Sequence, residues 1–426
     1  MAGSMDRKRL TAIIGGSAGN LVEWYDWYAY SALTIYFAAS FFPKGDPTAQ
    51  LLGAAAIFAV GFLMRPIGAY VMGIYADRQG RKAGLTLSVA LMCGGSLMIA
   101  LAPTYAQVGN LAPGILVVAR MIQGLSVGGE YGASSTYLSE MATRNNRGFW
   151  SSFQYVTLIG GQLVALAVLL LLQGLLSEAE LNSWGWRIPF AIGAALALVV
   201  YLLRRRLAET AAFDALAADR PTSTAARLWR EHRREFLIIV AISGGTSGAF
   251  YAFTTYMQKF LVNTSGFGKQ SATEIMTAAL IVFMLVQPLW GALSDRIGRK
   301  PLLMFAGFGG MIVAVPIFSE LAVTKSASAA FALVLVPLVI IAAYNSIAAV
   351  FKAELFPPHI RSLGVSLPYA IGNAALGGTA EYVALWFKKE GLESGFYWYI
   401  AGLLAVSTAG FLMLPETKRT SLIVED

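Results

Sequence analysis

Gly73-Ile-Tyr-Ala-Asp77-Arg78-Gln-Gly80-Arg81-Lys82 is followed, 218 residues later, by Gly291-Ala-Leu-Ser-Asp295-Arg296-Ile-Gly298-Arg299-Lys300. Six of the ten positions are identical, and all six are glycine or charged. An internal repeat at a long, fixed spacing indicates the architecture of a chain more directly than its hydropathy does. The pair therefore predicts a chain built from two similar halves.

Two further correspondences have nearly the same spacing, 214 and 207 residues: Glu140 and Arg147 match Glu354 and Arg361, and Leu207-Ala-Glu209-Thr210 matches Leu414-Pro-Glu416-Thr417. Three offsets close to half the chain length indicate a parallel duplication, as in transporters built from parallel repeats. We predict a first half over residues 1–207, a charged and Ala-rich linker with some helix over 208–235, and a second half over 236–426.

The composition places both halves in a membrane. Of the 426 residues, 57% are hydrophobic and 13% are charged, whereas soluble domains carry about 25% charged residues. Uncharged stretches recur, and several exceed the roughly 20 residues that a helix needs to cross the hydrocarbon core. The stretches lack the ten-residue alternation of a membrane barrel. The predicted fold is all helical, with twelve transmembrane helices, six in each half.

The basic residues indicate how the helices are oriented. The net charge is +8, but the Lys and Arg residues form short clusters between apolar runs, which argues against nucleic acid as a partner. Most of them fall on the side of the predicted path that holds the N-terminus, so the positive-inside rule places both termini in the cytoplasm. The cluster from Arg227 to Arg234 is expected to contact anionic lipid headgroups, with a protein partner as the alternative.

The repeated loops, together with Arg120-x-x-Gln123-Gly124, resemble the motifs of the major facilitator superfamily. Three other stretches resemble its metabolite:proton symporter family: Gly19-Asn20-Leu-Val-Glu23-Trp-Tyr-Asp26, Phe62-Leu-Met-Arg65-Pro66-Ile-Gly68 and Gly124-Leu-Ser-Val-Gly128-Gly129-Glu130-Tyr131. The sequence also resembles the α-ketoglutarate carriers of that family at three stretches: Ser152 to Gln162, Thr254 to Lys259 and Ala380 to Leu385. The likeness runs from the first predicted helix to the last.

This resemblance implies a monomeric carrier of the bacterial inner membrane that takes up α-ketoglutarate or a similar dicarboxylate by alternating access. Protons would be the coupling ion, with no other cofactor and no metal. Citrate, another organic acid or a proline- or betaine-type osmolyte remain alternative substrates, and a channel or membrane sensor remains an alternative class. An enzyme is disfavoured because the chain has two histidines and no recognisable catalytic set, metal spacing or phosphate loop.

Six ionisable residues fall within predicted spans, where charges are costly and indicate function: Glu23, Asp26, Arg65, Arg120, Glu130 and Glu381. Counting ~1.5 Å per residue from the cytoplasmic ends places Glu23, Arg65 and Glu130 near the midplane. We predict that Asp26 and Arg120 form a proton-coupling pair, with Glu23 as the alternative carrier; Glu130 is a further candidate. The structural alternative is a permanent ion pair that holds two helices together.

Arg65 is the predicted substrate clamp, because a planar guanidinium can hold a carboxylate by two parallel hydrogen bonds. Its alternative is a structural brace with Glu23 or Glu130. In the second half, Phe283 and Val334 occupy the positions equivalent to Arg65 and Arg120, so we expect proton and anion chemistry mainly in the first half. The other substrate-binding candidates are polar residues of predicted spans: Tyr28, Gln154, Tyr155, Tyr251, Tyr256, Asn345, Asn373 and Lys259. Each has helix packing as its alternative, or, for Lys259, snorkelling to the interface.

The charged loop residues are predicted to be gates. By resemblance, they link helices within and between the halves while the cytoplasmic side is closed: Asp77, Arg78, Arg81, Glu140, Arg147, Asp295, Arg296, Arg299, Glu354 and Arg361. The alternative is that they serve only as topology signals.

Overall fold

The computed structural model describes the chain in segments: residues 2–79, 81–128, 131, 135–136, 138–139, 142–143, 145–205, 225–357 and 360–423. Side chains are not described for 2–19, 73–74, 76–79, 81–85 and 203–205. All regular structure in these segments is helical.

The first half begins with one long helix and continues as an up-and-down bundle. Its elements are α1 (Ala2–Phe41), α2 (Pro47–Gln79), α3 (Arg81–Leu101), α4 (Tyr105–Val108), α5 (Leu111–Val127), α7 (Arg147–Ser151), α8 (Phe153–Leu175), α9 (Glu178–Glu180), η1 (Leu181–Gly185) and α10 (Arg187–Arg205). The connection from α3 to α5 shows how the chain reverses: Pro103 follows α3, and Gly109 adopts a φ of 58° that favours glycine.

The second half repeats this plan with more breaks. Its elements are α12 (Ala225–Tyr251), η2 (Ala252–Tyr256), α13 (Met257–Asn263), α14 (Lys269–Ile297), α15 (Lys300–Val323), α16 (Ala327–Asn345), α17 (Ala348–Glu354), α18 (Arg361–Gly372), η3 (Asn373–Gly377), α19 (Ala380–Lys389) and α20 (Glu393–Met413). The π-helical turns η2 and η3 interrupt two passes, and such turns are frequent at functional sites. Since α12 begins at Ala225, the part of the predicted linker that the structure describes is the start of this helix.

Counted over the described residues, the long helices make twelve passes, six in each half. Seven of them are individually long and apolar enough to cross a membrane, and an eighth qualifies if the bent pair Glu178–Gly185 and Arg187–Leu202 is one span. The apolar parts of α3 and α5, Thr86–Leu101 and Leu111–Val127, are shorter. Glu23 and Asp26 lie in one pass and Glu381 lies in another. These charged side chains lower the mean hydropathy of the two passes.

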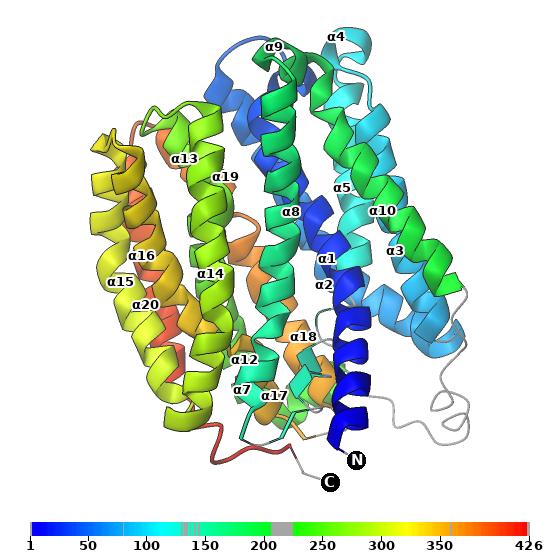
Figure 1. The fold of residues 1–426 in the computed structure, drawn as a ribbon, viewed down its shortest axis with the longest axis vertical. Helices are drawn as coiled ribbons and strands as arrows, with labels where there is room; N and C mark the ends of the chain where they lie inside the picture. The colour runs from blue at the N-terminus through cyan, green and yellow to red at the C-terminus, as the bar shows by residue number, and fades with distance from the viewer. Residues whose placement is uncertain are drawn as a thin grey trace.

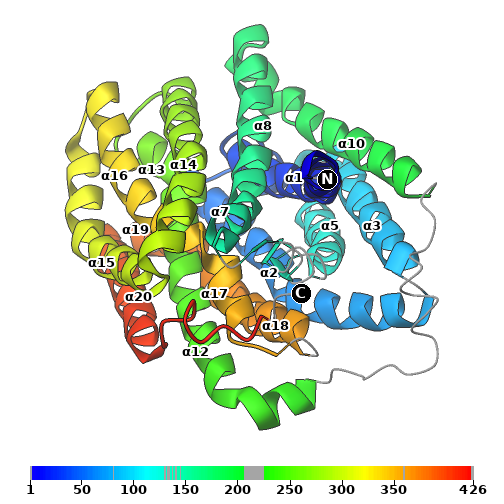
Figure 2. The ribbon, with the colours of Figure 1, turned by 60° about the horizontal axis from the view of Figure 1, so that its bottom comes forward.

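The two halves pair their helices in the same way. In the first half α1 packs on α8, α2 on α5 and α3 on α10; in the second, α12 packs on α18, α14 on α16 and α15 on α20. This agreement is what a duplication produces. Viewed from the end that carries both chain termini, the halves lie side by side, with α1 to α10 on one side and α12 to α20 on the other (Figures 1 and 2).

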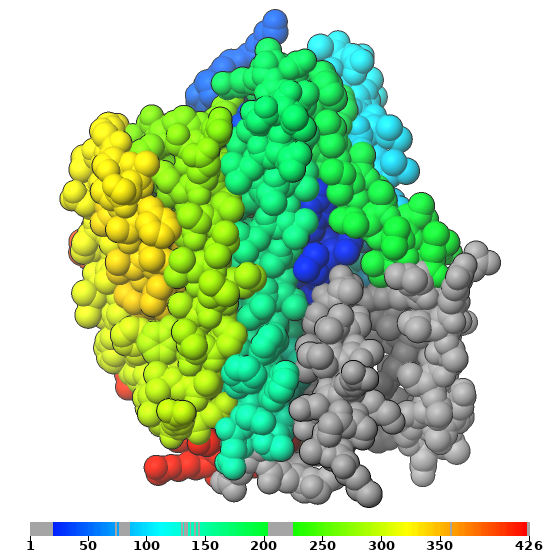
Figure 3. All heavy atoms as spheres, viewed as in Figure 1, coloured from blue at the N-terminus to red at the C-terminus, as the bar shows by residue number. Residues whose placement is uncertain are grey.

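The halves contact each other at both ends of the bundle. On the face shown in Figure 3, α8 of the first half runs beside α14 of the second. Near the end with the termini, α7 meets α14 so closely that a Cβ on Gly291 would lie 2.4 Å from the Gly148 carbonyl oxygen. Near the other end, Gln173 on α8 donates to Thr273 on α14 at 3.2 Å. The described parts of the two halves therefore touch near both ends of the bundle.

Candidate functional site

A small cavity lies between the halves, where α1, α2 and the region after α5 face α18 and η3. Its lining is aromatic and polar, with one cation and one carboxyl group: Asn20, Glu23, Trp24, Arg65, Val127, Gly128, Tyr131, Ser366, Tyr369, Ala370 and Asn373. Pockets with an apolar body and a few polar groups are typical of small-molecule sites. The predicted residues Glu23, Arg65 and Asn373 thus meet in one cavity, to which both halves contribute.

Arg65 is the cation of this cavity and is only 3% exposed. Its guanidinium carbon lies 4.1 Å from the ring centres of both Trp27 and Phe62, which are cation–π contacts. Its Nε and Nη2 atoms have no hydrogen-bond partner. Because buried polar groups are almost always hydrogen-bonded, unmet donors on a cavity wall indicate a place for an acceptor such as a carboxylate.

Asp26 and Arg120 lie together, but no direct contact joins these two described residues. Asp26, 1% exposed, accepts hydrogen bonds from Ser96 Oγ at 2.5 Å and from Gln123 Nε2. Gln123 Oε1 in turn accepts from Arg120 Nη1 at 2.7 Å. The predicted pair of Asp26 and Arg120 is therefore bridged by Gln123, whose amide offers a donor to the carboxylate and an acceptor to the guanidinium.

Trp27 connects this bridged pair to Arg65 in the cavity between the halves. The Arg120 guanidinium carbon lies 3.8 Å from the Trp27 ring centre, and Arg65 lies 4.1 Å from the same centre. Both guanidinium groups therefore contact one ring. The Trp27 side chain that they share is fully buried.

A second small cavity is formed by residues from α1, α8, η2, α13 and α14: Tyr28, Ser31, Ala32, Gln162, Leu166, Thr254, Thr255, Gln258 and Met276. It contains the predicted Tyr28. Beside it, Lys259 is fully buried, with its Nζ 2.9 Å from Glu381 Oε1 and 2.7 Å from Ser31 Oγ. Lys259 therefore neither snorkels nor stands free for a substrate; it ties α13 and α19 of the second half to α1.

The remaining substrate-binding candidates are all buried. Tyr251 packs against Phe62 across the halves, with ring centres 5.0 Å apart. Tyr155 packs against Phe250 at 5.8 Å, while Asn345 Nδ2 has no hydrogen-bond partner. Tyr256 packs against Phe396 at 5.4 Å. Gln154 is buried near the first turns of α8. None of these candidates is in the lining of either cavity.

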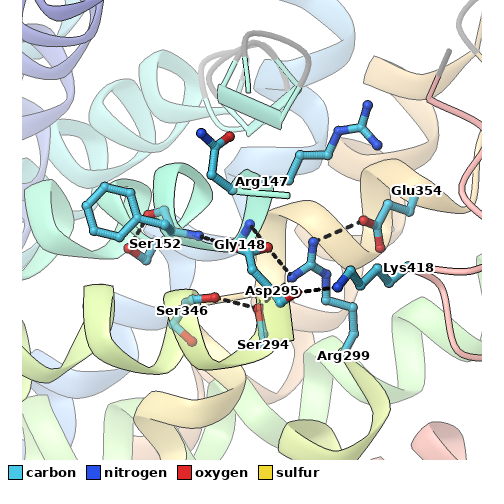
Figure 4. A network of polar contacts seen from close by, with 12 residues as sticks. Arg147, Gly148, Ser152, Ser294, Asp295, Arg299, Ser346, Glu354 and Lys418 are labelled. Atoms are coloured by element: carbon cyan, nitrogen blue, oxygen red, sulfur yellow. Dashed lines mark hydrogen bonds and ion pairs between the residues drawn. The ribbon is translucent and has the colours of Figure 1, made fainter. Parts of the chain in front are cut away.

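The predicted gating residues of the second half form a network with the first (Figure 4). Asp295 accepts from the backbone N–H groups of Gly148 and Phe149, at 2.8 and 2.9 Å. These groups belong to the first turn of α7, where an anion is favoured. Arg299 then binds Asp295 at 2.8 Å and Glu354 at 3.3 Å. A carboxylate of one half thus caps a helix of the other.

Backbone contacts extend this network toward the C-terminus. Glu416 accepts from the N–H groups of Arg299 and Lys300 at 2.7 and 2.9 Å. Arg361 donates to the carbonyl oxygens of Phe356 and Leu422, at 3.1 and 2.8 Å. By contrast Arg296 is exposed and lies outside the network.

Five predicted residues cannot be compared with the structure. Glu130 and Glu140 lie outside the described residues, as do the side chains of Asp77, Arg78 and Arg81. Arg147 is buried, and its Nη1 lies 3.5 Å from Ser421 Oγ.

The model of the Major Facilitator Superfamily matches residues 17–380. The chain belongs to this superfamily. It is 52% identical over 414 residues to the α-ketoglutarate permease of Escherichia coli strain K12, covering 97% of this chain and 95% of the relative. It is also 33% identical to the citrate-proton symporter of Klebsiella pneumoniae, with 93% and 91% covered. The solved structure of the xylose transporter XylE of E. coli, titled as partially occluded and inward open, shares the fold with a TM-score of 0.77 and 19% identity, over 95% of this chain and 98% of that one.

The resemblance and the major facilitator fold predicted from the sequence are thereby confirmed. The superfamily and these relatives are transporters, so this chain is a multi-pass membrane transporter and not an enzyme.

Several residues of this candidate site were not predicted as site residues from the sequence. Ser96, Gln123 and Trp27 act through contacts between different helices, and of these only the spacing of Arg120 and Gln123 gave a signal, since residues three apart share a helix face. Lys352 was also missed. It follows the uncharged run that ends at Phe351, and it is fully buried in α17.

Proposed function

We propose that this chain is a proton-coupled symporter that takes up α-ketoglutarate or a similar dicarboxylate by alternating access. The observation that carries the proposal is the buried Arg65, whose two unmet donors lie on the wall of a cavity made by both halves. A planar guanidinium binds a carboxylate through two parallel hydrogen bonds. The 52% sequence identity to an α-ketoglutarate permease, which extends over nearly the whole chain, supports this substrate class.

The proton is carried by the acids beside the cavity, without any other cofactor. Asp26 shares Gln123 with Arg120, so protonation of Asp26 removes the charge that this bridge stabilises and frees Arg120 to move. Arg120 and Arg65 both stack on Trp27. Substrate binding at Arg65 and proton binding at Asp26 can therefore influence each other through one side chain, while Glu23 is the second acid available at the cavity itself.

The transporter works as a monomer in a bacterial inner membrane, with both termini in the cytoplasm. The concentration of Lys and Arg on the side of the termini supports this orientation. The network of Asp295, Arg299 and Glu354 then closes the cytoplasmic side, and the contacts of Lys259 with Ser31 and Glu381 close the outer side. Rocking of the halves breaks one set of contacts while the other stays formed.

Uptake of labelled α-ketoglutarate into vesicles containing only the purified protein tests the proposal. An acidic exterior should drive accumulation above the external concentration, and a protonophore should abolish it. Unlabelled dicarboxylates should compete, whereas proline and betaine should not. Facilitated equilibration without accumulation, or competition by osmolytes alone, would contradict the proposal; absence of counterflow would indicate a channel.

A further inference from the structure

A second buried cation lies behind the substrate cavity, on the half opposite to Arg65. Lys352 belongs to α17 and is fully buried. Its Nζ atom lies 4.4 Å from the ring centre of Tyr369 and 3.5 Å from the hydroxyl oxygen of Tyr131. In the segments that the structure describes, no carboxylate forms an ion pair with it. Aromatic faces and a hydroxyl group stabilise an ammonium ion without neutralising it.

The two tyrosines that hold Lys352 also line the cavity that contains Arg65. Tyr131 comes from the first half and Tyr369 from the second, and their rings stack with centres 3.8 Å apart and planes 12° apart. The stack therefore joins the halves, and its two rings both line the cavity and contact the Lys352 amine. When the halves rock, these rings must separate, because each moves with its own half.

A dicarboxylate has an anionic group at each end, and a cavity built for it needs a cation for each. Arg65 supplies one from the first half. A buried charge is costly unless it is paired, so an amine surrounded by aromatic rings is suited to hold its charge when a carboxylate arrives with the substrate. We propose that Lys352 binds the second carboxylate of the dicarboxylate once the Tyr131–Tyr369 stack opens, which makes it a specificity-determining residue. This inference rests on the proposed function.

The role can be tested with two monocarboxylate probes. 2-Oxopentanoate is α-ketoglutarate with its distal carboxylate replaced by a methyl group, and 4-oxopentanoate has the other carboxylate replaced in the same way. Each is used to compete against labelled α-ketoglutarate uptake. In the unmodified protein, loss of either carboxylate should weaken binding by roughly 10- to 100-fold, the range for a hydrogen bond to a charged group.

The Lys352→Gln variant should bind α-ketoglutarate about as weakly as it binds the probe that lacks the carboxylate assigned to Lys352. It should still discriminate against the other probe. Arg65→Gln should lose discrimination against the opposite probe. Lys352→Arg should keep both preferences, because the positive charge remains. Lys325→Gln, at an exposed lysine that donates to the Ser265 carbonyl oxygen, is the matched control and should behave like the unmodified protein.

Variants are compared only as monodisperse purified protein. Lys352→Met is prepared beside Lys352→Gln, so that at least one variant with a neutral side chain at this position can be measured. If the neutral variants keep both preferences, or weaken all three ligands by the same factor, Lys352 is a structural brace and the inference is overturned. Failure of the proposed function looks different, because the unmodified protein itself would then not take up α-ketoglutarate.

Discussion

The carboxyl group of Asp26 is held by two neutral donors, Ser96 and Gln123, and reaches the Arg120 charge only through the Gln123 amide. A direct salt bridge would oppose protonation strongly, whereas a bridged pair leaves the acid able to exchange its proton as the arginine moves. This arrangement suits a proton carrier better than a permanent brace between helices.

We therefore expect Asp26→Asn to uncouple transport from the proton. The amide cannot bind a proton but still fits the hydrogen bonds of Ser96, so exchange of labelled for unlabelled α-ketoglutarate should continue. Accumulation driven by a pH gradient should be lost. The accumulated amount of α-ketoglutarate should fall to the level that the unmodified protein reaches with a protonophore. Asp46→Asn, in an exposed connection before α2, is the control. Normal accumulation by Asp26→Asn would assign the proton to another acid, with Glu23 the next candidate.

At the scale of single residues, the sequence predicted where the charged side chains lie better than it predicted which side chains they contact. The depth count placed Glu23 and Arg65 at one level, and both line one cavity. The contacts of Trp27 with two arginines, and the pairing of Lys259 with Glu381, join residues from different helices. Their formation depends on how those helices rotate and pack, which periodicity within one helix does not determine.

At the scale of helices, the crossing of α7 and α14 depends on two glycines. A Cβ on Gly291 would lie 2.4 Å from the carbonyl oxygen of Gly148, closer than real Cβ contacts allow. Small residues let helices approach in this way, and the approach brings Asp295 to the first turn of α7. The sequence pointed to Gly291 as part of a repeated motif, but neither to Gly148 nor to the contact between them.

Gly291→Ala should therefore weaken closure of the end that carries the termini. A cysteine at Ser366, on the cavity wall, placed in a Cys93→Ser background, should react with a membrane-impermeant maleimide severalfold faster from that side. The Gly402→Ala control adds the same methyl group where nothing lies within 4 Å, and its labelling rate should not change. Equal rates in the two variants would mean that the glycine contact does not control access.

On the scale of the whole molecule, the duplication explains why so much of the fold was predictable. Equal offsets between motifs predict two equal bundles, and the helix pairs of the first half recur in the second. The bends were not predictable, because η2 and η3 interrupt continuous apolar sequence. The contacts near both ends were not predictable either, since they join the two halves and do not follow from the pattern within one.

The charge of the whole transport complex gives a last prediction, which rests on the proposed function. Moving a dianion inward against an inside-negative potential costs ~2.3 kcal/mol per charge per 100 mV. Two protons cancel this cost, and a third makes uptake electrogenic. With the pH equal on both sides, an inside-negative potential set by potassium and valinomycin should therefore not slow the entry of α-ketoglutarate. Vesicles with no imposed potential are the control. Inhibition by the potential would mean that fewer than two protons enter with each dianion, so that Asp26 and Glu23 are not both protonated during transport.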